Sequence, residues 1–496
     1  STCKIWMGGV DSCYHWNCAE VDKSVKSAHN ALQLADNTGI QTMVLHLHFH
    51  SCIANVTTER LAAAHKNLED LKSVIIPGQL MNEVLYHQAA GVLAWHENDL
   101  NTAYERIARA TELSEHAGIN FSYAFHLAGL AVISFEQGNI EEAKRIIQRA
   151  DNTARAENIS YSLFDIELFK AYFALQQGHR ESALRSLDSG LALGSKDNRI
   201  ASVWWRSHIM SALCTLALEA GIHTDYVRLI ISKRNLIPNQ HDAALEQWPW
   251  PVRIHMLDGL RIEIDDKPLS FGCKPPAKPL ELLKTLIAMG SQNIKANRLA
   301  DRLWPDAEGD DALESFKITL RRLRKLLQHD DILPLHEGSL SLNYDYCWTD
   351  VHTLLELFKN FSSLDKGNSK TRTSKEIIRL YSGSFLGEDD ILSAYQLREQ
   401  LRSIFMQAVN HLGRHYEAAS QWQQAIDCYG KGLETEELTE AFYQQLIACY
   451  LQLELPAEAL QVYSRCERVF QRELGIEPSA KTKMLLRDYR DTDKAF

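Results

Sequence analysis

Apolar positions recur at helical spacing over most of the chain, and from about residue 82 to 235 this pattern repeats with a period close to 40. Turn residues stand 40 positions apart at Asn98, Gly138 and Gly178. Small and apolar residues follow each turn at the same offsets, namely Ala103, Ala143 and Ala183, then Ile107, Ile147 and Leu187. Such units are typical of helical hairpins that stack into a solenoid. With further helices expected from Val21 to about Leu80, residues 1–235 are predicted to form a tetratricopeptide-like sensor or interaction arm.

The helical pattern stops before Pro238, and residues 236–251 are predicted to be a linker that ends in Trp248-Pro249-Trp250-Pro251. Apolar residues then alternate with polar ones from Val252 to Met256 and from Leu260 to Ile264, the period of two expected of half-buried strands. Helical spacing follows in three segments, and a last pair of strands is expected around Glu337-Gly338. The expected segments are 280–289, 295–303 and 312–328 for the helices, and 332–335 and 340–344 for the strands. Sheet, three helices and a terminal hairpin is the order of a winged helix, predicted over residues 252–350.

Residues 362–375 are polar and are interpreted as a linker, after which helical spacing returns. The repeat is now 34 residues long, because Ala425 and Tyr429 recur as Ala459 and Tyr463, and this is the tetratricopeptide period. Residues 351–496 are therefore predicted to form a second helical-repeat arm. The predicted fold class is mostly α, with two helical-repeat solenoids flanking a small α+β winged-helix domain.

The predicted helix at 312–328 is the most informative segment. Its apolar residues Leu313, Phe316, Leu320, Leu323 and Leu327 fall on one face, which is expected to be buried. The opposite face is centred near Ile318. Five basic residues against Glu314 give the helix a net charge of +4, although the whole chain carries −11.

A basic helix of this kind can enter a DNA major groove, where Arg grips guanine O6 and N7 and an exposed Ile can contact a thymine methyl group. Arg324, nearer the buried edge, is interpreted as a phosphate contact. The alternative is a charged face that is simply solvated. The residues predicted to contact DNA are Ser315, Lys317, Ile318, Thr319, Arg321, Arg322, Arg324 and Lys325.

Composition agrees with a globular protein, since 45% of the residues are hydrophobic and 24% are charged. No apolar run approaches the length of a membrane span, and no secretory signal opens the chain, so we expect no membrane partner. The ten cysteines form no CxxC pair, which favours reduced thiols and a cytoplasmic location. The first residue is Ser1, and we expect the C-terminal piece of a longer protein.

About half of the chain, from residue 252 to about 490, resembles the SARP family of bacterial transcriptional activators. The matching segments are Leu257-Asp258-Gly259, Lys278 to Leu283, Arg298 to Ala307 and Leu320 to Leu327 in the winged helix. In the C-terminal arm they are Leu380 to Leu386, Glu458 to Tyr463 and Arg472 to Ser479, which are similar to the bacterial transcriptional activator domain. The N-terminal arm is similar to the repeat arms of large regulators with a nucleotide-driven switch domain upstream. No GxxxxGK[ST] loop occurs, so any such switch is expected outside this chain.

The resemblance implies a dimer that binds direct repeats in promoter DNA and contacts RNA polymerase, through a sigma factor or another subunit. The loop before the basic helix carries Asp306, Glu308 and Asp310, and we hypothesise that it meets a basic polymerase surface. The predicted wing from His336 to Ser339 departs from the family because it has no Arg or Lys at its tip. The N-terminal arm is expected to receive either a small inducer or a protein signal.

Other functions are weaker interpretations. His46, His48 and His50 with Cys52 resemble metal ligands, but only His46 and His50 share a helical face, so no metal and no cofactor is predicted. Tryptophans at 204, 205, 248 and 250 are expected in the core rather than in a ligand pocket. No GxSxG, HExxH or dinucleotide loop occurs, so catalysis is not expected. The alternative function is a tetratricopeptide-repeat scaffold without sequence-specific DNA binding.

Overall fold

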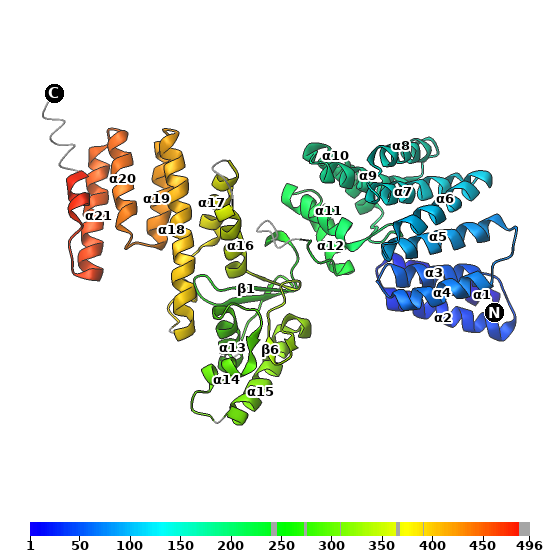
Figure 1. Ribbon diagram of the computed structural model, residues 1–496, viewed down its shortest axis with the longest axis horizontal. Helices are drawn as coiled ribbons and strands as arrows, with labels where there is room; N and C mark the ends of the chain where they lie inside the picture. Colours follow the sequence, from blue (N-terminus) through cyan, green and yellow to red (C-terminus); the bar gives the residue numbers. More distant parts are fainter. Residues whose placement is uncertain (240–245, 272–274, 308, 364–367, 390, 486–496) are drawn as a thin grey trace. The chain divides into compact units, whose positions relative to one another are not determined.

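The computed structural model describes residues 1–239, 246–271, 275–307, 309–363, 368–389 and 391–485. Contacts divide the chain into two compact units. Unit 1 consists of residues 1–240 with 247–249, and unit 2 of residues 241–246 with 250–496. The predicted mostly α architecture is confirmed, with tetratricopeptide-like helices in both units; among the described residues, the strands lie in a small part of unit 2 (Figure 1). None of the described helices combines the length and apolar character needed to cross a bilayer.

Unit 1 is a series of antiparallel helical hairpins. Its helices are α1 (Thr2–Asn17), α2 (Val21–Thr38), α3 (Val44–Val56), α4 (Leu61–Ser73), α5 (Leu80–His96), α6 (Leu100–His116), α7 (Asn120–Glu136), α8 (Ile140–Ala156), α9 (Ser160–Gln176), α10 (Arg180–Lys196), α11 (Ser207–Ala220) and α12 (Thr224–Arg234). The predicted turns at Asn98, Gly138 and Gly178 all have positive φ and separate successive helices. The small residues Ala103 and Ala143 are fully buried, as close helix packing requires.

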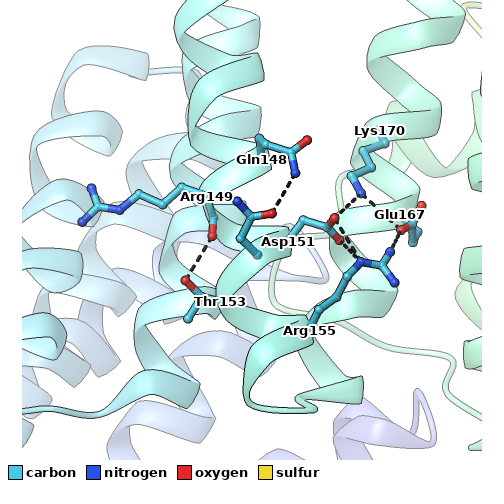
Figure 2. A network of polar contacts seen from close by, with 8 residues as sticks. Gln148, Arg149, Asp151, Thr153, Arg155, Glu167 and Lys170 are labelled. Carbon is cyan, nitrogen blue, oxygen red and sulfur yellow. Dashed lines mark hydrogen bonds and ion pairs between the residues drawn. The ribbon is translucent and has the colours of Figure 1, made fainter.

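A polar network joins α8 to α9 across the hairpin interface (Figure 2). Asp151 of α8 pairs with Arg155 at 3.0 Å and with Lys170 of α9 at 3.0 Å. Glu167 of α9 pairs with Arg155 at 2.6 Å and with Lys170 at 3.2 Å. Burial alone would raise the pKa of the Asp151 carboxyl, but the contacts with Arg155 and Lys170 outweigh burial and hold this pKa below its ordinary value. Two carboxylates thus share two cations, which balances the charge of two buried carboxylates next to an exposed Arg155.

Unit 2 begins with the small domain predicted as a winged helix. Its strands are β1 (Val252–His255), β2 (Arg261–Ile264), β3 (Lys267–Pro268), β4 (Ile294–Lys295), β5 (Leu335–His336), β6 (Ser339–Leu340) and β7 (Cys347–Thr349). Its helices are α13 (Ala277–Ala288), α14 (Ala296–Leu303) and α15 (Gly309–Leu327), followed by the 3-10 turn η2 (Asp330–Ile332). One sheet has the order β3-β2-β1-β7 and the other β4-β6-β5. Strands β5 and β6 form the expected hairpin, and Glu337 and Gly338 in its turn both have positive φ.

The remaining elements are helices α16 (Asp350–Ser363), α17 (Asn368–Leu380), α18 (Tyr395–Ala418), α19 (Trp422–Thr435), α20 (Glu440–Gln452) and α21 (Pro456–Leu474), with the 3-10 turn η3 (Leu392–Ala394) before α18. The predicted linker at 362–375 is wrong, because most of it belongs to α16 and α17. The inward face of α17 buries Ser374 one turn before Ile377 and Ile378, so a polar residue interrupts the apolar period that marks a helix.

A buried carboxylate connects the small domain to the helices that follow it. Asp350, at the start of α16, accepts hydrogen bonds from the backbone amides of Met256 at 2.8 Å, Leu257 at 2.9 Å and Val351 at 2.8 Å. The amide of Leu386 donates to the carbonyl of Met256 at 2.7 Å in the same region. A single apolar core continues from β1 into the helices of the C-terminal arm. The small domain and the C-terminal arm are therefore packed together in one unit.

Candidate nucleic-acid interface

Helix α15 is fixed by its apolar side. Phe316, Leu320, Leu323 and Leu327 are buried in the core of unit 2, while Leu313 is half-buried. Asp310 and Asp311 lie in the first turn, where carboxylates interact favourably with the positive end of the helix dipole. The helix therefore has one possible orientation in the domain, and its remaining side faces solvent.

The outward side of α15 carries an apolar residue among exposed cations. Ile318 is 47% exposed, and Lys317, Arg321, Arg322 and Lys325 are exposed around it. Within the described part of the chain, Arg321, Arg322 and Lys325 take part in no ion pair, whereas Lys317 lies 3.4 Å from Glu314. The described residues of unit 2 provide no partner for the exposed Ile318 or for the arginines beside it, so this face is available to a ligand with negative charge.

Two predicted residues lie differently from this face. Thr319 is only 5% exposed, so the structure does not bring it to the outward side with the cations. Arg324 is half-buried, and its Nε and Nη2 donate to the carbonyl of Leu333 at 3.1 and 2.6 Å. Arg324 thus ties α15 to the segment after η2. Ser315 is half-buried at the edge of the face.

The structure places a basic side chain, that of Lys295, beside the wing, and the sequence pattern did not identify it. Lys295 of β4 pairs with Ser339 of β6, directly beside the wing turn, and the amide of Ala296 donates to the carbonyl of Gly338 at 2.8 Å. Lys295 is exposed and has no ion pair among the described residues, and the same holds for Arg298 and Arg302 of α14. The wing itself lacks Arg and Lys, but the adjacent strand and helix place positive charge next to it. The signal in the sequence is the excess of basic residues between 295 and 302.

An open groove of about 1160 Å³ runs between the second half of α15 and the wing. It is lined by Arg321, Arg324 and Lys325 from α15, by Asp330 and Asp331 from η2, and by Pro334, His336, Asn343 and Tyr346. Its wall on α15 is positive and its wall on η2 is negative. A polyanion is therefore expected to follow the α15 wall and the exposed face beyond it rather than to fill the groove.

The predicted polymerase-contact loop is described in part. Asp306 is exposed in the segment between α14 and α15, and Asp310 is exposed in the first turn of α15. Glu308 lies outside the described residues. The two described carboxylates are thus on the surface and are positioned by the N-terminal end of the same helix whose other residues form the basic face.

The histidines and tryptophans singled out in the sequence are placed as follows. His46 and His50 lie on α3 with Cys52 buried nearby, and burial lowers the pKa of His50 to about 4. In the part of the chain that the structure describes, no three His, Cys, Asp or Glu side chains come together as metal ligands. Trp204, Trp248 and Trp250 are buried in the cores of their units, as predicted.

Comparisons with known proteins concern the C-terminal arm first. Residues 352–488 match the bacterial transcriptional activator domain. A comparison with characterised protein sequences gives no match.

Solved structures that are similar to parts of the chain include the following three. EmbR of Mycobacterium tuberculosis, in complex with a low-affinity phosphopeptide, is 18% identical over 49% of this chain and 66% of its own, with a TM-score of 0.38. A Rap protein complexed with the competence and sporulation factor is 10% identical over 95% of this chain and 99% of its own, with a TM-score of 0.34. The apo form of the quorum sensor NprR from B. thuringiensis is 9% identical over 94% of this chain and 98% of its own, with a TM-score of 0.32. The chain thus spans slightly less than two thirds of the EmbR chain.

The matching model describes a domain of bacterial transcriptional activators. Its boundaries fall on α16 to α21 and the segment after them, so the match covers the arm that packs against the small domain with the basic helix. The chain therefore carries a bacterial transcriptional activator domain over residues 352–488, which supports a transcriptional regulator of the SARP type.

Proposed function

We propose that the chain is a sequence-specific, double-stranded DNA-binding transcriptional activator and that α15 enters the major groove. The observation that carries this proposal is the outward face of α15, where Ile318 is exposed among Arg321, Arg322 and Lys325 and none of these cations is paired within the described residues. The opposite face is locked in the core of unit 2. DNA supplies the negative charge and the thymine methyl groups that such a face can contact.

Each basic residue has a role that follows from its position. Arg321 and Arg322 extend from the exposed face and can grip a guanine with two parallel hydrogen bonds. Lys325 and Arg324 lie on the wall of the groove, and Lys295 and Arg298 lie beside the wing, where they suit phosphate oxygens. In the same duplex, α15 would therefore contact the bases, and residues on both sides of α15 would contact the phosphates.

Activation requires a second contact. The bacterial transcriptional activator domain supports activation as the function, and by the SARP resemblance the protein would bind direct repeats as a dimer in the cytoplasm and touch RNA polymerase. The exposed Asp306 and Asp310 stand at the N-terminal end of α15, away from its basic residues along the helix. This separation would let one end of the helix face polymerase while the basic face contacts DNA.

The test is selection of bound duplexes from a random library at fixed salt, followed by gel-shift titration of the selected sequence. Arg322→Ala should relax the preference at one base position and weaken binding by about 1–3 kcal/mol. Arg414→Ala is the matched control, because Arg414 is equally basic but exposed on α18. If the wild-type chain selects no sequence, a scaffold function replaces the proposed one. If Arg322→Ala weakens every duplex equally, Arg322 contacts phosphate instead.

A further inference from the structure

Unit 1 contains a cavity of about 660 Å³ at the level of α12. Its walls come from the turn between α1 and α2, the segment after α3, the start of α11 and the end of α12. Side chains with hydrogen-bonding groups dominate one part of its surface, namely Thr57, Thr58, Ser207, His208, Asn235 and Asn239. This volume lies in the range of about 300–1,000 Å³ that is usual for small-molecule sites.

Arg234, the last residue of α12, lines this cavity. Its Nη2 donates to the carbonyl of Thr57 at 3.2 Å, and its guanidinium carbon lies 5.7 Å from the centre of the Trp205 ring. Within the described residues no carboxylate pairs with it. Burial lowers the pKa of Arg234 to about 10, so the guanidinium still carries its charge at neutral pH. A sheltered guanidinium with five N–H donors and a single described acceptor is an incomplete site.

Among the described residues, the charged side chains around Arg234 form no ion pair with it. Arg60 is paired with Asp22 at 2.7 Å, both on the rim of the cavity. Lys233 is exposed and has no ion pair among the described residues. The lining thus holds three cations, Arg60, Lys233 and Arg234, against two carboxylates, Asp22 and Glu59. The Nε2 of His208 donates to the carboxylate of Glu136 at 3.2 Å and adds no acceptor for Arg234.

We propose that this cavity binds a small-molecule anion whose carboxylate or phosphate group pairs with the guanidinium of Arg234. Such groups accept two parallel hydrogen bonds from arginine, which is the geometry that the fork of donors favours. Lys233 and Asn239 stand on the same lining and supply further donors, while Val21, Ile237 and Pro238 offer an apolar surface to the rest of the molecule. This site lies wholly in unit 1 and goes beyond the proposed reading of DNA by unit 2.

The experiment uses the full chain, with inorganic phosphate and succinate as probes at constant ionic strength set with sodium chloride. Isothermal titration calorimetry measures binding, and the unfolding temperature is followed over the same titration. The wild-type chain should bind at least one probe and unfold at a higher temperature as that probe is added. Arg234→Lys keeps the charge but loses the planar fork, and it should weaken binding about tenfold.

Arg234→Met separates ligand binding from a structural role. If the guanidinium serves a ligand, this variant should be at least as stable as the wild type without probe and should lose the response to it, because an unpaired sheltered cation is removed. Arg185→Met is the control, since Arg185 is exposed on α10 and does not line the cavity, and it should respond as the wild type does. Binding that is unchanged in Arg234→Met, or no binding of either probe by the wild type, would overturn the proposal.

Discussion

The hydrogen bonds that Asp350 accepts predict a large effect of a very small substitution. Asp350→Asn keeps the size of the side chain but replaces one acceptor oxygen by an amide group, which is itself a donor. Three backbone amides point at this carboxylate, those of Met256, Leu257 and Val351. Asparagine can satisfy only part of this set, and its NH₂ group must face at least one of the amides.

The expected loss follows from the number of donors left without an acceptor. One buried amide without a partner costs about 1–3 kcal/mol, and here the group that faces it is itself a donor, so we expect a loss at the upper end of this range, about 3 kcal/mol. In a unit of this size a loss of 1 kcal/mol in stability lowers the unfolding temperature by about 2–4 °C, so the unfolding temperature of unit 2 should fall by about 6–12 °C. Differential scanning calorimetry of the full chain at pH 8 measures it.

The pH dependence gives a second signature. Burial raises the pKa of Asp350 from 3.8 to about 6, against the effect of the backbone amides. A raised carboxyl pKa in the folded state adds stability that is fully present below pH 3.8 and is lost as the pH rises through 6. The difference in unfolding free energy between the wild type and Asp350→Asn should therefore be largest in acid, decrease as the pH rises to about 6 and stay constant above that pH. A gap within about 0.5 kcal/mol of zero at every pH would refute the role given to Asp350.

Three further outcomes are expected. Lys295→Ala should weaken the binding of all duplexes alike and reduce the slope of log K against log salt by about 0.9, measured by titration at several salt concentrations. Asp151→Asn should destabilise unit 1 by about 1–2 kcal/mol in denaturant unfolding at neutral pH. The loss is no larger because Arg155 is exposed and solvent screens its ion pairs. Since the pKa of Asp151 is lowered in the folded state, this loss of stability should shrink as the pH falls below 3.8. Asp306→Ala combined with Asp310→Ala should abolish transcription activation in a reconstituted assay while DNA affinity stays within about twofold, and unchanged activation would exclude the loop as the polymerase contact.

The parts of the fold that could be predicted from the sequence are those with strong local periodicity. The turns at Asn98, Gly138 and Gly178 and the buried side of α15 follow from helical spacing alone, and the structure confirms them. Strand β7 was not predicted, because its three residues are too few to show an alternation and its partner β1 lies far away in sequence. Helix α17 was not predicted either, because the buried polar residue Ser374 interrupts its apolar pattern.

The candidate sites also contain some residues that local spacing predicts and others whose positions depend on the tertiary structure. The outward residues Ile318, Arg321 and Arg322 follow from rotation about one helix. The position of Lys295 beside the wing depends on the pairing of β4 with β6, and the bond from Arg324 to Leu333 depends on how the segment after η2 folds back. The cavity around Arg234 brings together segments 177 residues apart, which no local pattern in the sequence reveals.

The most direct measurement of the central claim is methylation protection of guanine N7, an atom that lies in the major groove, on a selected duplex. The wild-type chain should protect one or more guanines, and Arg321→Ala or Arg322→Ala should each lose protection at a single guanine, while Arg414→Ala protects as the wild type does. A bound complex in which every guanine N7 stays accessible, or in which both α15 variants keep the full pattern, would contradict the entry of α15 into the major groove.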